Sequence, residues 1–269
     1  MNNLFQMKHL FPVLPVFLLF ACSSAPSDVK EVAEGRSGYV PHSMDNDSEI
    51  EQHYNRFKDV SGASRSTGNV GNGKLINGRI VPFKGVNFHY FDTTSYLKNR
   101  CFVHEKVLNT ILGAYVALET TAPGIQFGLM ECSRENGGKI RPHLTHQNGL
   151  SVDFMTPLLK DGKQCTDYDY TGAPHYFMEF DADGIYKRDQ SVSIDFETMA
   201  LHLLTLIEMA GKNGLALEKV ILKLDLKDNL FATPSGKKLK ASGVYFAQQL
   251  TPIINRLHDD HFHVDFQLR

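Results

Sequence analysis

The sequence has no tryptophan and only four cysteines in 269 residues, and its charges nearly balance. Lysine and arginine total 28 and aspartate and glutamate 30, a formal net charge of −2. A chain without a basic excess has little to neutralise a phosphate backbone, so we expect no nucleic-acid partner. No apolar run reaches the ~18 residues that a membrane-spanning helix needs. These absences leave an enzyme or a binding protein built around one main domain.

Residues 1–22 have the pattern of a targeting segment. Lys8 is the only charged residue before Asp28, and the stretch Leu10–Ala21 is apolar except for two prolines, which would break a core helix. A positive region followed by a short apolar run is typical of a secretory signal. The run ends in Leu19-Phe20-Ala21-Cys22-Ser23, which resembles the bacterial lipobox.

The lipobox resemblance implies that Cys22 is lipidated and becomes the first residue of the mature protein. Ser23 at the next position resembles signals that are sorted to the outer membrane. We therefore expect a periplasmic lipoprotein that contacts a membrane through its lipid anchor only. Plain secretion is the alternative.

Three cysteines remain in the mature chain, Cys101, Cys132 and Cys165. The compartment permits disulfides, and an odd number predicts one bridge and one buried free thiol, with the pairing left open. The three are too widely spaced in the sequence to indicate a thiolate metal site.

Small and polar residues dominate residues 23–72. Such a stretch cannot bury enough apolar surface to offset its ordering entropy, so it predicts a flexible tether with one short helix near Ile50–Phe57. The folded domain is expected to span residues 73–269.

Helical and strand patterns alternate through residues 73–269 without a regular rhythm. The apolar spacing predicts helices over 103–118, 196–210 and 243–257, the last interrupted or restarted at Pro252. It predicts strands over 125–129, 220–226 and 261–268. No glycine-rich phosphate loop follows a strand. The pattern therefore indicates an α+β fold with a central antiparallel sheet flanked by helices, and not a Rossmann fold.

Five of the twelve histidines fall in two short groups, at residues 143–146 and 258–263. In the second group, strand alternation places His261, His263 and Asp265 on one face. The alternate residues Phe262 and Val264 then point into the core. Two imidazoles about 7 Å apart on a strand anchored in the core form a rigid platform.

His146 lies seven residues before Asp153, more than ~20 Å away along an extended chain. The two side chains meet only if Gln147-Asn148-Gly149 turns back, which Asn-Gly favours. Two histidines and one carboxylate, with a position left open for water, suit catalytic zinc. Non-haem iron uses the same types of ligand.

A resemblance joins the two groups. The stretches Gly137–Ile140 and His143–Asp153 resemble the penicillin-insensitive murein endopeptidase family, and its second motif, His-x-x-His-x-His, matches residues 258–263. The resemblance covers residues from about 85 to 269. Thr145 stands where the family often has Ser, and Ser151 stands where it often has Asp.

The resemblance implies one zinc ion per chain with His146, Asp153 and His263 as ligands. It implies that His261 acts as general base or transition-state stabiliser, with His258 beside it. His143, Gln147 and Ser151 would line the site or support the ligands. The zinc site is expected on the sheet, in a cleft.

The function that the resemblance implies is hydrolysis of peptidoglycan cross-links of the D-alanyl–meso-diaminopimelate type by metal-activated water. The substrate would be the peptide stems of the cell wall. A D-Ala-D-Ala carboxypeptidase or dipeptidase on the same fold is one alternative. A non-catalytic lipoprotein that binds cell wall or metal is the other.

Overall fold

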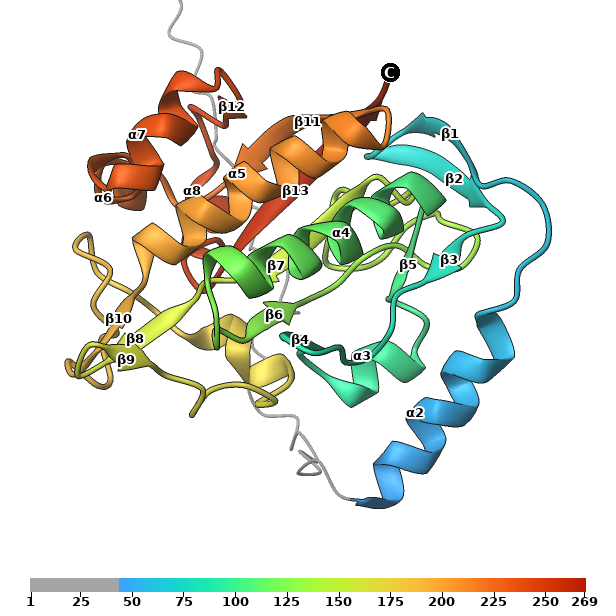
Figure 1. Cartoon of the computed structure of the whole chain (residues 1–269), viewed down its shortest axis with the longest axis horizontal. Coiled ribbons are helices and arrows are strands. Elements are labelled where there is room, and N and C mark those ends of the chain that lie inside the picture. Colours follow the sequence, from blue (N-terminus) through green and yellow to red (C-terminus); the bar gives the residue numbers. More distant parts are fainter. Residues whose placement is uncertain (1–43) are drawn as a thin grey trace, which may run out of the picture. The chain divides into compact units, whose positions relative to one another are not determined.

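The computed structural model describes residues 44–269 (Figure 1). The predicted signal over residues 1–22, with Cys22, lies outside the described residues, as do residues 23–43. No helix in the described part of the chain is both long enough and apolar enough to cross a membrane.

A mixed sheet of six strands forms the centre of the domain, in the order β12-β11-β13-β7-β6-β4. Its strands are β4 (Phe88–Tyr90), β6 (Phe127–Leu129), β7 (Ser151–Met155), β11 (Leu215–Ile221), β12 (Tyr245–Phe246) and β13 (His261–Leu268). The four inner strands pair antiparallel, whereas β4 and β12 pair parallel with their neighbours. The predicted antiparallel sheet is right at its centre and wrong at both edges, where helical crossovers allow parallel pairing.

Two long helices, α4 (Glu105–Thr121) and α5 (Phe196–Lys212), lie side by side over one face of this sheet (Figure 1). Asp195 caps α5 by accepting a hydrogen bond from the backbone of Thr198 at 3.0 Å, as its sequence position predicts. The shorter helices are α2 (Met44–Phe57), α3 (Thr93–Leu97), α6 (Lys227–Ala232), α7 (Pro234–Ala241) and α8 (Pro252–Arg256), with 3-10 turns η1 (Ala173–Phe177) and η2 (Leu224–Leu226).

The remaining strands form small sheets around the central one. β1 (Arg65–Asn69) and β2 (Asn72–Ile76) form a hairpin, and β3 (Arg79–Ile80) pairs with β5 (Phe102–Val103). β8 (Leu158–Lys160) lies between β9 (Lys163–Gln164) and β10 (Val192–Ile194).

The sheet face under α4 and α5 is the core face. Phe154 of β7 and Phe262 of β13 stack there with ring centroids 5.4 Å apart. His202 of α5 lies against both rings and against Phe127. The opposite face is therefore left for the polar side chains of β7 and β13.

The tether predicted over residues 23–72 contains the short helix expected near Ile50–Phe57, as the second half of α2, but from Met44 onward it is folded against the domain and not flexible. Helix α2 buries Ile50, and its Phe57 ring packs against Phe102 of β5 at 5.3 Å. Ile50, Tyr54 and Phe57 follow helical spacing, a short apolar stripe within a polar segment. The β1–β2 hairpin, whose turn is held by Asn69, also begins before residue 73, at Arg65.

Three other expectations also need correction. The predicted strand over 220–226 starts earlier, at Leu215, and residues 224–226 form the 3-10 turn η2. The helix predicted over 243–257 is present only after the expected restart at Pro252, as α8, because β12 occupies its first turn. The expected disulfide is absent from the described residues: Cys101, Cys132 and Cys165 are all buried free thiols.

Burial of His202 predicts a pH-dependent stability. Neither ring nitrogen has a hydrogen-bond partner among the described residues, and desolvation lowers the pKa of His202 to about 3. Because the unfolded chain binds this proton near pH 6.5 and the folded chain does not, stability is lost as the pH falls below 6.5. We expect the free energy of unfolding, measured with urea, to fall when the pH is lowered from 7 to 5. The decrease should be about 2 kcal/mol larger for wild type than for His202→Leu. Equal losses in the two proteins would contradict this assignment.

Candidate metal centre

The register of β7 against β13 builds the centre of the site. Asp153 pairs directly with His263, and Ser151 pairs with Asp265. Directly opposed side chains on one sheet face have Cβ atoms about 4.5–5.5 Å apart. Phe262 alternates with these residues and is buried on the core face, as the strand pattern predicts.

The loop before β7 brings His146 to the same point. His146 has φ +63° and Gly149 has φ +78°, so the chain reverses between them. A Cβ on Gly149 would lie 2.8 Å from the backbone nitrogen of His104, which restricts this position to glycine. As a result, His146 Nε2 lies 3.2 Å from Asp153 Oδ2. The predicted reversal is present and begins at His146 itself.

The β1–β2 hairpin braces this loop. The backbone nitrogen of Gln147 donates to the Val70 carbonyl at 3.0 Å, and its side-chain amide donates to the Gly71 carbonyl at 2.7 Å. The Gln147 carbonyl accepts from Gly138 at 2.8 Å. The buried Gln147 side chain therefore anchors the loop that carries His146 to the hairpin.

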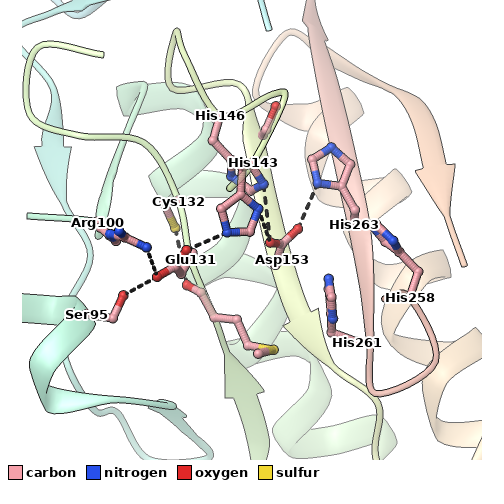
Figure 2. Close-up of polar contacts among 12 residues, drawn as sticks. Ser95, Arg100, Glu131, Cys132, His143, His146, Asp153, His258, His261 and His263 are labelled. Carbon is pink, nitrogen blue, oxygen red and sulfur yellow. Dashed lines mark hydrogen bonds and ion pairs between the residues drawn. The ribbon is translucent and has the colours of Figure 1, made fainter. Parts of the chain in front are cut away.

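Three imidazoles surround the Asp153 carboxylate (Figure 2). His263 Nδ1 lies 2.7 Å from Oδ1, and His143 Nδ1 lies 3.7 Å from Oδ2, the oxygen that also faces His146. Single ligand atoms of His143, His146 and Asp153 all lie within 4.8 Å of one another. These three residues form a compact group that could hold a metal ion, and His263 adjoins it on the far side of Asp153.

The donor atoms fit a metal ion. His146 is fully buried, and neither of its ring nitrogens makes a hydrogen bond among the described residues; Asp153 Oδ2 likewise makes none. Buried polar atoms without hydrogen bonds each cost ~1–3 kcal/mol, so such a group is usually retained for a ligand. Imidazole nitrogen with carboxylate oxygen is a donor set that suits zinc.

Two further carboxylates orient the imidazoles on either side of Asp153. His143 Nε2 lies 2.6 Å from Glu131 Oε2, and His263 Nε2 lies 2.7 Å from Asp265 Oδ1. In each ring this contact leaves Nδ1 directed at Asp153. Carboxylate–histidine pairs of this kind fix the orientation and raise the basicity of metal ligands.

Glu131 is itself held in place by hydrogen bonds from the Ser95 hydroxyl at 2.7 Å and from Arg100 Nη1 at 2.8 Å. Burial acts to raise the pKa of Glu131, but the bond from His143 and the charges of His143 and Arg100 prevail and lower it to about 2. Glu131 was not predicted as a site residue. Its one local mark in the sequence is an acidic residue between Met130 and Cys132 in an apolar stretch.

Asp265 is fixed in the same way. It accepts a hydrogen bond from the Ser151 hydroxyl at 2.6 Å, and Lys219 Nζ lies 2.7 Å from its other oxygen. Lys219 reaches this face because a bulge between Leu217 and Lys219 inserts one extra residue into β11. Burial acts to lower the pKa of His263, but Asp265 and Asp153 raise it to about 10. Without metal, His263 is thus an imidazolium between two carboxylates.

The remaining two histidines of the second group form a neighbouring pair. The His261 and His258 ring centroids are 4.8 Å apart. His261 Nδ1 lies 3.1 Å from Asp260 Oδ1, and His258 Nδ1 lies 2.7 Å from the Ile254 carbonyl. Burial lowers the pKa of His261 to about 4 and that of His258 to about 3, so both rings are neutral at pH 7.

Tyr176 of η1 is a site residue that the sequence analysis did not identify. Its ring centroid lies 5.2 Å from that of His261 and 6.3 Å from that of His143. Its hydroxyl is buried without a hydrogen-bond partner among the described residues, and burial holds its pKa well above 10. The phenol is therefore a neutral donor beside the histidines. Tyr176 lies far from both histidine groups in the sequence, so no local pattern marked it.

Comparison with known proteins gives one family. The model of a family described as penicillin-insensitive murein endopeptidase matches residues 66–268. No curated protein matches the chain. The matched span begins in β1, about 20 residues before the resemblance found in the sequence. It therefore includes the hairpin that braces the His146 loop.

The contact between His263 and Asp265 predicts a loss of metal affinity on substitution. In Asp265→Asn, the carboxylate that orients the His263 ring and raises its basicity is removed, and Lys219 is left without its partner. We expect the affinity for Zn²⁺ to fall ~10–100-fold, measured by competition with a chromophoric chelator. Glu218→Gln, an exposed change on the neighbouring strand, is the control and should leave the affinity unchanged. Equal affinities in all three proteins would remove Asp265 from the support of the metal centre.

Proposed function

The chain belongs to the penicillin-insensitive murein endopeptidase family of metallopeptidases, and we propose that it hydrolyses peptide cross-links in peptidoglycan with one zinc ion held by His146, Asp153 and His263. The observation that carries the proposal is the buried Asp153 carboxylate with imidazoles directed at both of its oxygens. Asp153 Oδ2 and both ring nitrogens of His146 make no hydrogen bond among the described residues.

His263 is preferred to His143 as the third ligand because of its position. It is 2% exposed on the central strand β13, whereas the His143 side chain is 16% exposed and comes from a loop. A strand in the core holds a ligand more precisely than a loop does. His143, supported by Glu131, then faces the side from which a peptide reaches the metal.

When bound, the metal supplies Lewis-acid chemistry: it makes water more acidic and polarises the peptide carbonyl. His261 is neutral and has Nδ1 next to Asp260, so its Nε2 is the atom that exchanges protons. It accepts the proton of the attacking water and returns it to the leaving amine. His258 packs beside this ring and restricts its movement.

The proposed attack by water has a consequence for inhibition. No serine acts as the nucleophile, so β-lactams, which acylate such a serine, have no target in this site. The proposed substrate bond joins D-alanine to meso-diaminopimelate. A lipid on Cys22 would tether the enzyme in the periplasm, at the outer membrane and within reach of the wall.

Substitution of His261 tests the catalytic assignment. We expect the full-length protein to contain about one zinc per chain and to convert cross-linked muropeptide dimers to monomers, with loss of activity to a chelator. In His261→Ala, kcat should fall ~10²–10⁴-fold while zinc is retained, because the general base is removed without removing a ligand. His146→Ala should lose the zinc. His53→Ala, in α2 outside the site, is the control and should retain both the bound zinc and the cleavage of dimers.

Other outcomes point to other functions. Release of terminal D-alanine without cleavage of dimers would make the protein a carboxypeptidase. A protein without metal that cleaves nothing even when zinc is supplied would be a binding protein on the same fold.

The lipid anchor has a separate test. In cells labelled with an alkyne analogue of palmitate, the wild-type chain should carry the label and sediment with outer membranes. Cys22→Ser should lose both properties because it lacks the thiol that accepts the lipid. An unlabelled wild-type chain in the soluble periplasmic fraction would favour plain secretion.

A further inference from the structure

A cavity of about 450 Å³ lies beside the histidines and not over them, so it is not the cleft predicted above the zinc site. One wall is the segment after α3, from Leu97 to Arg100, and the other is the turn from Arg134 to Gly137 after β6. Both walls are held by backbone hydrogen bonds: Cys132 donates to Arg100 at 2.7 Å, and Gly137 donates to Arg134 at 2.9 Å. The cavity is therefore a defined feature of the fold.

The lining of this cavity is cationic. Lys98, Arg100 and Arg134 contribute three positive charges, against one carboxylate from Glu135. Arg100 is paired with Glu131, outside the cavity. Lys98 and Arg134 form no ion pair with any residue in the described range 44–269. Asp92, which is not part of the lining, interacts electrostatically with Lys98. Among the lining residues themselves positive charges outnumber negative ones, which favours binding of an anion.

The cavity is linked directly to the metal centre. Arg100 Nη1 bonds to Glu131 Oε1, and Glu131 Oε2 bonds to His143 Nε2, so one carboxylate separates the cavity wall from a site imidazole (Figure 2). The second amino group of Arg100 donates to the Arg141 carbonyl at 3.3 Å, which leaves other guanidinium donors free.

We propose that this cavity is a substrate subsite that binds a free carboxylate of the peptide whose bond is cleaved at the metal centre. The inference rests on the proposed function and deepens it. Guanidinium and ammonium groups recognise carboxylates by charge-assisted hydrogen bonds. The substrate class is therefore an anionic peptide, and the enzyme discriminates against stems whose carboxylates are amidated.

The test compares two muropeptide dimers, one with free stem carboxylates and one with the same groups as carboxamides. On the free carboxylate form, Arg134→Ala and Lys98→Ala should each raise KM roughly tenfold, with kcat and zinc content unchanged. On the carboxamide form, wild type should already have the raised KM, and the two variants should add little to it. Arg188→Ala, another exposed arginine, on the turn before β10, is the matched control and should resemble wild type on both substrates.

Unchanged KM values in both variants, or equal losses on the two substrates, would overturn the subsite. Failure of the proposed function looks different, since wild type would then cleave neither dimer. In that case calorimetry of the uncleaved stem tetrapeptide still decides the inference. Wild type should bind the carboxylate form about tenfold more tightly than the amide, and Arg134→Ala should bind both alike. Equal binding of the two forms by wild type would refute the subsite.

Discussion

The burial of the Asp153 carboxylate is the constraint on which the rest of the site depends. It is 1% exposed, and a buried carboxylate is costly unless charge and hydrogen bonds compensate it. Burial acts to raise its pKa, but the interactions with His146 and His263 prevail and hold the pKa well below its usual value. Each of the imidazoles around Asp153 must therefore be placed accurately, and much of the surrounding structure serves that placement.

The residues that orient the imidazoles are themselves held by residues from distant parts of the chain. Asp265 orients His263 and depends in turn on Ser151 and on Lys219, which a bulge in β11 turns toward it. Glu131 orients His143 in the same manner. The β1–β2 hairpin braces the loop that carries His146. Buried polar atoms without hydrogen bonds lower the stability of the folded protein. The hydrogen bonds and ion pairs around the site offset part of this loss and hold the imidazoles in place.

Several features followed from local pattern alone. The alternation over 261–268 predicts β13 and the face that carries His261 and His263, because a strand places every second residue on one side. Asp195 predicts the start of α5 because an N-cap is a local interaction. The pattern fails where short elements follow one another. The apolar spacing over 243–257 predicts a helix that is interrupted or restarted at Pro252, whereas the chain first forms β12 and becomes helical only in α8, from Pro252 to Arg256.

The sequence by itself determined the two histidine groups, the side chains that share a face of β13, and the resemblance to a murein endopeptidase family. These depend on residue type and on spacing within one segment. Only the tertiary structure decided that His143 and His263 lie on opposite sides of Asp153, that Glu131 holds His143, and that Tyr176 lies beside the histidines. Asp153 and His263, for example, are 110 residues apart in the chain, and such contacts are set by strand register and loop packing, which no local periodicity encodes.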